Sequence, residues 1–153
     1  MNEIKVLLVD DEKEFVNSLA ERIEMRDLGS KIAYDGEEAL RLVDDEIPDV
    51  VVLDLRMPGI DGIEVLRRLK KNYPKVQVIV LTGHGSEKDE KMAKELGAFE
   101  YLQKPTSIEH LTKQIKKAFK AKLEDPMVAA TYAEAGDEKT ARDILGPSKK
   151  NKG

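Results

Sequence analysis

The segment that most limits the possible folds is the apolar run Val50-Val51-Val52-Leu53, which leads directly into Asp54. A short apolar run without polar alternation is typical of a strand that is buried on both faces of a parallel sheet. The Pro58-Gly59 pair that follows favours a turn shortly after the strand. Asp54 is therefore predicted at the carboxyl end of a central strand, where open α/β sheets place their functional residues.

The segments before and after this strand repeat the same unit, a strand followed by a helix. Apolar runs predict further strands at residues 4–9, 31–34, 76–81 and 99–102. Five such units predict an α/β fold of the flavodoxin-like (βα)5 kind, with a doubly wound five-stranded parallel sheet. Because crossovers of this kind are right-handed, few strand orders remain, and we expect the order 2-1-3-4-5.

The helices in these units are predicted from apolar residues that recur at spacings of three and four. Such spacing places the apolar side chains on one face of each helix, toward the sheet. The residues predicted to face the core are Phe15, Val16, Leu19, Ala20, Ile23, Ala39, Leu40, Val43, Ile63, Leu66, Leu69, Met92, Ala93, Leu96, Ile108, Leu111, Ile115, Ala118 and Phe119.

The composition argues against several classes of protein. A chain of 153 residues has the length of one ordinary domain with a short appendage, and its first residues are charged rather than typical of a secretory signal. Its apolar runs are far shorter than the roughly 20 residues of a membrane span. The chain has no cysteine, and its net charge of -4 gives no support to a nucleic-acid-binding surface. We expect a cytoplasmic protein that binds neither membrane nor nucleic acid.

Three carboxylates are expected to meet where the winding of the sheet reverses. In the order 2-1-3-4-5 this crevice lies between the first and third strands, so it brings Asp10 and Asp11 beside Asp54. Grouped carboxylates repel one another unless a positive charge lies among them, and Mg²⁺ prefers such oxygen ligands. An alternative for Asp10 or Asp11 is an N-cap of the helix that begins just downstream.

Two further strand ends could contribute to the same edge of the sheet. Thr82 follows the fourth strand and Lys104 the fifth, and a hydroxyl and an ammonium there could both donate to a phosphoryl oxygen. Alternatively, Thr82 is a turn residue and Lys104 a solvated side chain. The loop that begins at Thr82 is weak as a phosphate cradle, because a single Gly-x-Gly is common. His84 and His110 lack the spacing of metal ligands.

Taken in order, these motifs resemble the receiver domain of two-component response regulators, the chemotaxis-type switch family. The resemblance covers about residues 3 to 122. The motifs that carry it are Asp10-Asp11, Leu53-Asp54 with Met57-Pro58-Gly59, Asp61-Gly62, Leu81-Thr82-Gly83 and Lys104-Pro105.

The resemblance implies that Asp54 accepts a phosphoryl group from a sensor histidine kinase or a phosphotransfer protein. It also implies a Mg²⁺ site formed by Asp11, Asp54 and the backbone carbonyl of Arg56, with Asp10 acting through water. By the same comparison Lys104 pairs with the phosphoryl oxygens and Thr82 closes on them. Pro105 resembles the family's cis-proline, although the ordinary preference of an X-Pro bond is trans.

The resemblance also implies a switch and a binding surface. Tyr101 matches the family's switch aromatic, whose ring turns inward when Thr82 moves toward the phosphoryl group; otherwise it is a half-buried aromatic on an edge strand. The switch would act on a downstream protein target or on a second copy of the chain. Arg56 and His84, each two residues beyond a site residue, are predicted to tune the lifetime of the aspartyl phosphate.

Past the fifth helix the chain changes character. The predicted boundaries are a receiver domain at residues 1–123, a helical extension at 124–147 and a disordered basic tail at 148–153. Asp125-Pro126 and Asp137 are expected to start the two helices of a hairpin, which would dock on the receiver and provide an output or dimer surface.

The sequence therefore predicts a stand-alone phosphorylation switch that is not a separate enzyme, beyond its own phosphorylation and slow autodephosphorylation. One alternative is an aspartyl-phosphate phosphatase of the haloacid-dehalogenase kind. An enzyme of that kind requires a second acidic residue two positions after the nucleophile, where this chain has Arg56. The other alternative is an interaction domain that works without phosphorylation.

Overall fold

The computed structural model describes residues 3–125, which form one alternating series of strands and helices. The predicted extension and tail lie outside the described residues, apart from Glu124 and Asp125. Within the described part, no helix has the length and apolar character needed to cross a membrane. The elements are β1 (Ile4–Val9), α1 (Lys13–Glu24), β2 (Leu28–Ala33), α2 (Gly36–Asp45), β3 (Val50–Leu53), α3 (Gly62–Asn72), β4 (Gln77–Thr82), α4 (Glu87–Glu95), β5 (Glu100–Gln103) and α5 (Ile108–Glu124).

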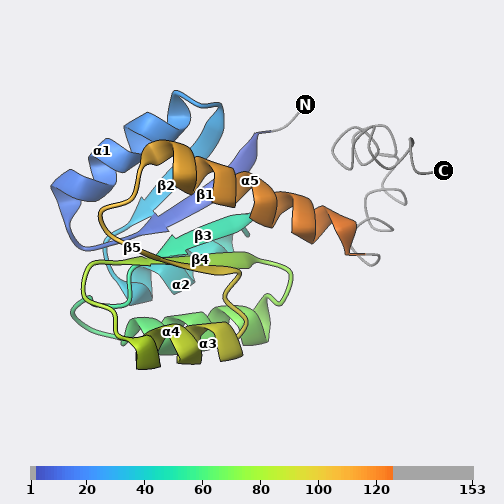
Figure 1. Cartoon of the computed structure of the whole chain (residues 1–153). Coiled ribbons are helices and arrows are strands. Elements are labelled where there is room, and N and C mark those ends of the chain that lie inside the picture. Colours follow the sequence, from blue (N-terminus) through green and yellow to red (C-terminus); the bar gives the residue numbers. More distant parts are fainter. Residues whose placement is uncertain (1–2, 126–153) are drawn as a thin grey trace.

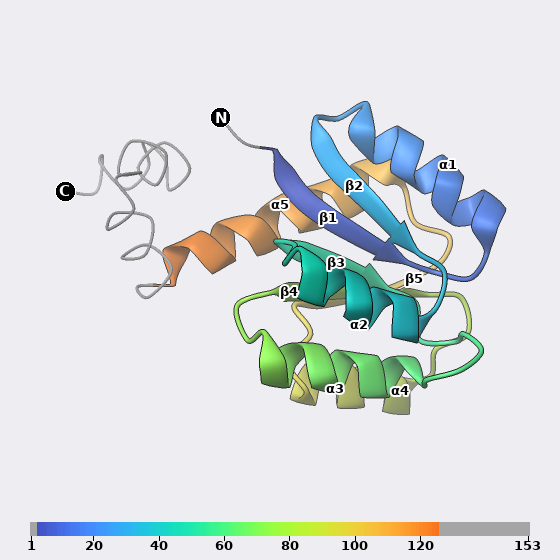
Figure 2. The ribbon, with the colours of Figure 1, turned by 180° about the vertical axis from the view of Figure 1, so that it is seen from behind.

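The five strands form one parallel sheet in the order β2-β1-β3-β4-β5, so the predicted fold and strand order are confirmed. Figure 1 shows α1 and α5 on one face of the sheet and α2, α3 and α4 on the other. The reverse view in Figure 2 shows the same three layers. The winding reverses between β1 and β3, which are hydrogen-bonded neighbours. The carboxyl ends of both strands therefore open into the same crevice.

The sheet is the centre of the core because both of its faces are covered. All four residues of β3 are at most 3% exposed, as expected for an apolar run without alternation. Burial of each such side chain contributes about 2 kcal/mol to folding, before the entropy cost of ordering the chain. Most of the helix residues predicted to face the core are buried. The partly buried ones are Phe15, Leu40, Met92, Leu96, Ile108 and Phe119.

The strand β2 begins three residues earlier than the sequence predicts. Gly29 and Ser30 are poor strand formers, so local preference places the start of this strand near Lys31. In the structure all six residues of β2 pair with β1, from Ile4 opposite Leu28 to Val9 opposite Ala33. Pairing with a buried neighbour overrides local preference here, because it satisfies the backbone N–H and C=O groups.

The start of α3 fixes the loop that follows Asp54. Asp61 caps this helix, since its side chain accepts a hydrogen bond from the backbone N–H of Ile63 at 3.0 Å. A Cβ atom on Gly62 would lie 2.5 Å from the Cα of Leu55, closer than real Cβ contacts. Only glycine allows this close approach, so the backbone just after Asp54 is held against α3.

Candidate functional site

The candidate site lies at the carboxyl edge of the sheet, where four strand ends bring together the predicted side chains. Asp10 follows β1, Asp54 follows β3, Thr82 ends β4 and Lys104 follows β5. Backbone hydrogen bonds join neighbouring strand ends: Asp54 N–H donates to the Val9 carbonyl at 3.0 Å, and Lys104 N–H to the Thr82 carbonyl at 2.9 Å. The structure therefore brings Asp10, Asp54, Thr82 and Lys104 to one place.

Asp54 is a buried carboxylate with one cation beside it. It is 4% exposed, and one of its oxygens accepts a hydrogen bond from the backbone N–H of Arg56 at 3.1 Å. Its other oxygen, Oδ2, lies 3.5 Å from Nζ of Lys104. The burial limits access of bulk water to this carboxylate, and the ammonium balances part of its charge.

Lys104 is the positive centre of the site. Its Nζ donates to Asp10 at 2.7 Å and to Glu12 at 2.8 Å, and it lies 4.2 Å from the centroid of the Phe15 ring. Burial alone lowers the pKa of the Lys104 ammonium, but its hydrogen bonds to Asp10 and Glu12 outweigh burial and hold that pKa above its ordinary value. Lys104 is therefore an anchored cation, not a solvated side chain. Its bond to Pro105 is cis.

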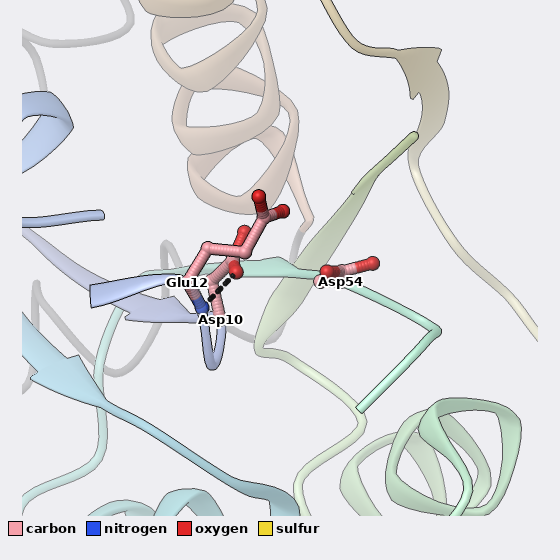
Figure 3. A group of neighbouring side chains, drawn as sticks. All are labelled: Asp10, Glu12 and Asp54. Atoms are coloured by element: carbon pink, nitrogen blue, oxygen red, sulfur yellow. Dashed lines mark hydrogen bonds between the residues drawn. The ribbon is translucent and has the colours of Figure 1, made fainter. Parts of the chain in front are cut away.

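The three acidic side chains Asp10, Glu12 and Asp54 form a cluster that Figure 3 shows at the ends of β1 and β3. One carboxylate oxygen from each lies within 4.8 Å of the others. Burial raises the pKa of Asp10, against the lowering effect of its hydrogen bond from Lys104. Three oxygen donors at this separation are compatible with a metal site, and a cation there would relieve the cost of burying these charges.

Glu12 is the member of this cluster that the sequence analysis missed. Its backbone N–H donates to Asp10 Oδ1 at 2.8 Å, and the hydrogen bond from Lys104 lowers the pKa of its carboxyl group. Asp11 is not among the three members of this cluster in the described chain, and its role as a metal ligand stays a prediction. The N-cap of α1 is Glu12, without a side-chain capping bond, so neither Asp10 nor Asp11 has the alternative role of N-cap.

Thr82 at the end of β4 and Tyr101 in β5 carry two buried hydroxyl groups. Within the described residues, neither Thr82 Oγ1 nor Tyr101 Oη has a hydrogen-bond partner. Burial is the main cause that raises the pKa of Tyr101, whose residue is 8% exposed, so its ring is already inside. A Cβ atom on Gly85 would lie 1.5 Å from Tyr101 Oη and 2.8 Å from Thr82 Cγ2. The absence of a side chain at Gly85 thus makes room for the ring.

Arg56 connects the loop after Asp54 to α4. Its guanidinium donates to Asp89 at 2.6 Å, and Asp89 belongs to a capping box with Ser86 at the start of α4. Ser86 ends the loop that starts at Thr82 and includes the exposed His84. The contact between Arg56 and Asp89 therefore also involves this loop. The far end of this loop is therefore held by the cap of α4.

The chain is similar in sequence and in structure to known proteins. Residues 6–116 match the response regulator receiver domain family. Among solved structures, a response regulator receiver domain protein from Clostridium thermocellum is 35% identical, with a TM-score of 0.74, over 77% of this chain and 95% of that one. A receiver domain of the Francisella response regulator 1452 is 33% identical, with a TM-score of 0.73, over 78% of this chain and 98% of that one.

A third structure is similar over a comparable length. The CheY-like response regulator receiver domain protein from Methanospirillum hungatei JF-1 is 25% identical, with a TM-score of 0.77, and the match covers 79% of this chain and 97% of that one. All three matches cover almost the whole of the other chain. Their similarity therefore extends over the full sheet and its helices, rather than over one motif.

Proposed function

The chain belongs to the family of response regulator receiver domains, which act in two-component signalling, and from this premise we propose that Asp54 is its phosphoryl acceptor. The donor would be a sensor histidine kinase or a phosphotransfer protein. The observation that carries the proposal is the buried carboxylate of Asp54, with an anchored ammonium at 3.5 Å and, at the next strand end, a buried hydroxyl of Thr82 that has no hydrogen-bond partner among the described residues.

In the proposed step an oxygen of Asp54 forms a bond to phosphorus while the P–N bond of the donor's phosphohistidine breaks. The imidazole nitrogen leaves with the electron pair and takes up a proton. Lys104 and Thr82 would donate hydrogen bonds to the phosphoryl oxygens, because transfer of this group needs positioning and charge neutralisation above all. We propose no separate enzymatic activity beyond this step and a slow autodephosphorylation.

The residues proposed to hold Mg²⁺ are Asp10 and Asp54, together with Asp11 and the backbone carbonyl of Arg56. When bound there, the ion supplies positive charge to the phosphoryl oxygens and orients them. Asp10 and Asp54 supply buried oxygen donors for this role. Glu12, which is more exposed, would keep Lys104 in position through its 2.8 Å hydrogen bond.

The proposed output is a change of binding surface governed by Thr82 and Tyr101. Because the Tyr101 ring is already inside, movement of Thr82 toward the phosphoryl group would change the packing around the ring rather than draw it inward, and α4, β5 and α5 would present an altered face. A downstream protein target or a second copy of this chain would read that face. The proposed location of these events is the cytoplasm, which the lack of cysteine favours.

Beryllofluoride, a phosphoryl mimic, tests whether Asp54 controls the state of the domain. With Mg²⁺ it is expected to shift amide NMR signals around Thr82 and Tyr101 in the wild type and to leave the Asp54→Asn protein unchanged, because the mimic needs the carboxylate. Identical spectra of the wild type with and without the mimic would support the alternative, an interaction domain that works without phosphorylation.

Gly85→Ala is expected to force the Tyr101 ring out of its buried position, since the added Cβ would overlap the hydroxyl oxygen. The loss of ring burial should lower the free energy of unfolding by about 2 kcal/mol. The ring resonance of Tyr101, measured with labelled tyrosine, should become that of an exposed ring and stop responding to beryllofluoride. Gly83→Ala is the matched control, because its Cβ would meet Lys104 carbon atoms at an ordinary 3.8 Å. A buried ring in the Gly85→Ala protein would contradict the proposed role of this glycine.

Arg56 and His84 are expected to set the lifetime of the aspartyl phosphate, because both lie two residues beyond groups that would contact the phosphoryl group. Arg56→Ala and His84→Ala should each change the half-life several-fold while leaving Mg²⁺ affinity nearly unchanged. Asp89→Asn should shift the half-life in the same direction as Arg56→Ala, since it releases the guanidinium held at 2.6 Å. Phosphate release from labelled protein measures the effect, and equal half-lives in all four proteins would refute it.

A further inference from the structure

A stripe of four lysines runs along the outer face of α5. Lys113, Lys116, Lys117 and Lys120 are all exposed, and their spacing of three, four and seven places them on one side of the helix. Arg26, which follows α1, joins them in lining a broad, shallow hollow of about 520 Å³. Glu109, which pairs with Arg26, and Thr112 line the same hollow, so its net positive charge comes from the four lysines.

Within residues 3–125, no carboxylate lies within ion-pair distance of these four lysines. The basic residues next to them are paired: Arg26 contacts Glu109 at 2.8 Å, and Lys122 contacts Asp49 at 2.7 Å. Like charges three or four residues apart on a helix destabilise it. The stripe therefore costs stability, and none of the described contacts offsets that cost.

We propose that this lysine stripe, with Arg26 at its side, is a docking site for an acidic segment of a partner protein. Carboxylates on a helix at the same spacing could face all four ammonium groups at once. The site would act on the unphosphorylated chain as well, because no lysine of the stripe contacts the residues of the candidate phosphorylation site. The inference thus extends beyond the proposed phosphoryl transfer and does not depend on it.

The charges around the stripe favour a short acidic protein segment over a long polyanion. The chain as a whole carries a net charge of -4, so a nucleic acid that extends past the stripe meets a negative surface. Charges farther away than about 8 Å are largely screened at physiological salt, and a short segment confined to the stripe experiences mainly the lysines. Stable contact with a membrane surface also needs apolar side chains, and the exposed large ones among residues 3–125 are Met25 and Ile47.

The test is selection from a displayed library of short random peptides on the full chain at about 0.15 M salt. The selected peptides are expected to be enriched in Asp and Glu at helical spacing. Replacing the four stripe lysines by glutamine should weaken their binding about tenfold, the sum of several exposed ion pairs. The control variant carries the same loss of charge at four exposed lysines elsewhere: Lys71→Gln, Lys75→Gln, Lys88→Gln and Lys91→Gln. It should bind the peptides as the wild type does.

Three results would overturn the proposal. The first is a selection with no acidic enrichment, and the second is an equal loss of binding in the control variant, which would indicate general attraction by net charge. The third is tighter binding of a short duplex DNA, or of vesicles with anionic lipid, than of the selected peptides. Circular dichroism of both variants should match the wild type, because glutamine and lysine have similar helix propensities.

Discussion

The Asp54→Ala protein is expected to take up no phosphoryl group from acetyl phosphate in the presence of Mg²⁺, whereas the wild type takes up one per chain. Asp54 combines burial with an ammonium at 3.5 Å, whereas Asp10 is hydrogen-bonded directly to that ammonium at 2.7 Å and Glu12 is exposed. A phosphoprotein assay after acid quenching measures the label, because acyl phosphates survive at low pH and hydrolyse in base.

The matched control for this experiment is Asp61→Asn. Asp61 lies in the same loop region but caps α3, and asparagine preserves a cap of that kind. This variant should be labelled like the wild type. Labelling of the Asp54→Ala protein at the wild-type level would rule out Asp54 as the acceptor, and labelling of the wild type with EDTA present would rule out the dependence on Mg²⁺.

Lys104→Met is expected to lower the free energy of unfolding without Mg²⁺ by about 3 kcal/mol, because it leaves the buried carboxylates of Asp10 and Asp54 without a cation. Saturating Mg²⁺ should restore more stability to this variant than it adds to the wild type, since the ion replaces the missing positive charge. Denaturant unfolding with EDTA or with Mg²⁺ measures both effects.

Lys122→Met is the control for the Lys104 experiment. Lys122 is similarly buried and contacts Asp49 at 2.7 Å, but this pair is separate from the acidic cluster. The control should lose stability and gain no more from Mg²⁺ than the wild type does. An equal Mg²⁺ response in the two variants would show that Lys104 and the ion do not share the same carboxylates.

The stability difference between Lys104→Met and the wild type should also depend on pH. Burial raises the pKa of Asp10 above its value in the unfolded chain, and loss of Lys104 removes a group that lowers it. A raised carboxyl pKa means that the folded protein disfavours the charged form. The deficit of the variant is therefore full at neutral pH and shrinks as the pH falls through the raised pKa of Asp10.

The fold could be predicted because its signals are local. The apolar run before Asp54 and the spacing of helix residues such as Leu66 and Ile115 predict which side chains are buried. The strand order follows from the rules for parallel sheets. The start of β2 could not be predicted, because Gly29 and Ser30 take strand geometry from their pairing with β1.

Residues of the candidate site could be predicted from the sequence only where they lie at or near the end of a strand. Glu12 belongs to it through a contact with Lys104, 92 positions away, and an exposed glutamate beside two aspartates has no local feature that indicates such a partner. The contact between Arg56 and Asp89 joins the loop after β3 to the first turn of α4 and likewise follows from the fold. The room that Gly85 makes for the Tyr101 ring depends on a side-chain orientation that no sequence pattern encodes.

The contact between Arg56 and Asp89 makes binding at α4 and chemistry at Asp54 mutually dependent. A partner that must separate these two side chains in order to bind the first turn of α4 also frees the guanidinium two residues after Asp54, the proposed phosphoryl acceptor. Coupling free energy is reciprocal. If phosphorylation raises the affinity of such a partner by a given factor, binding of the partner favours the phosphorylated form by the same factor. The downstream partner would then shift the equilibrium between the unphosphorylated and the phosphorylated chain.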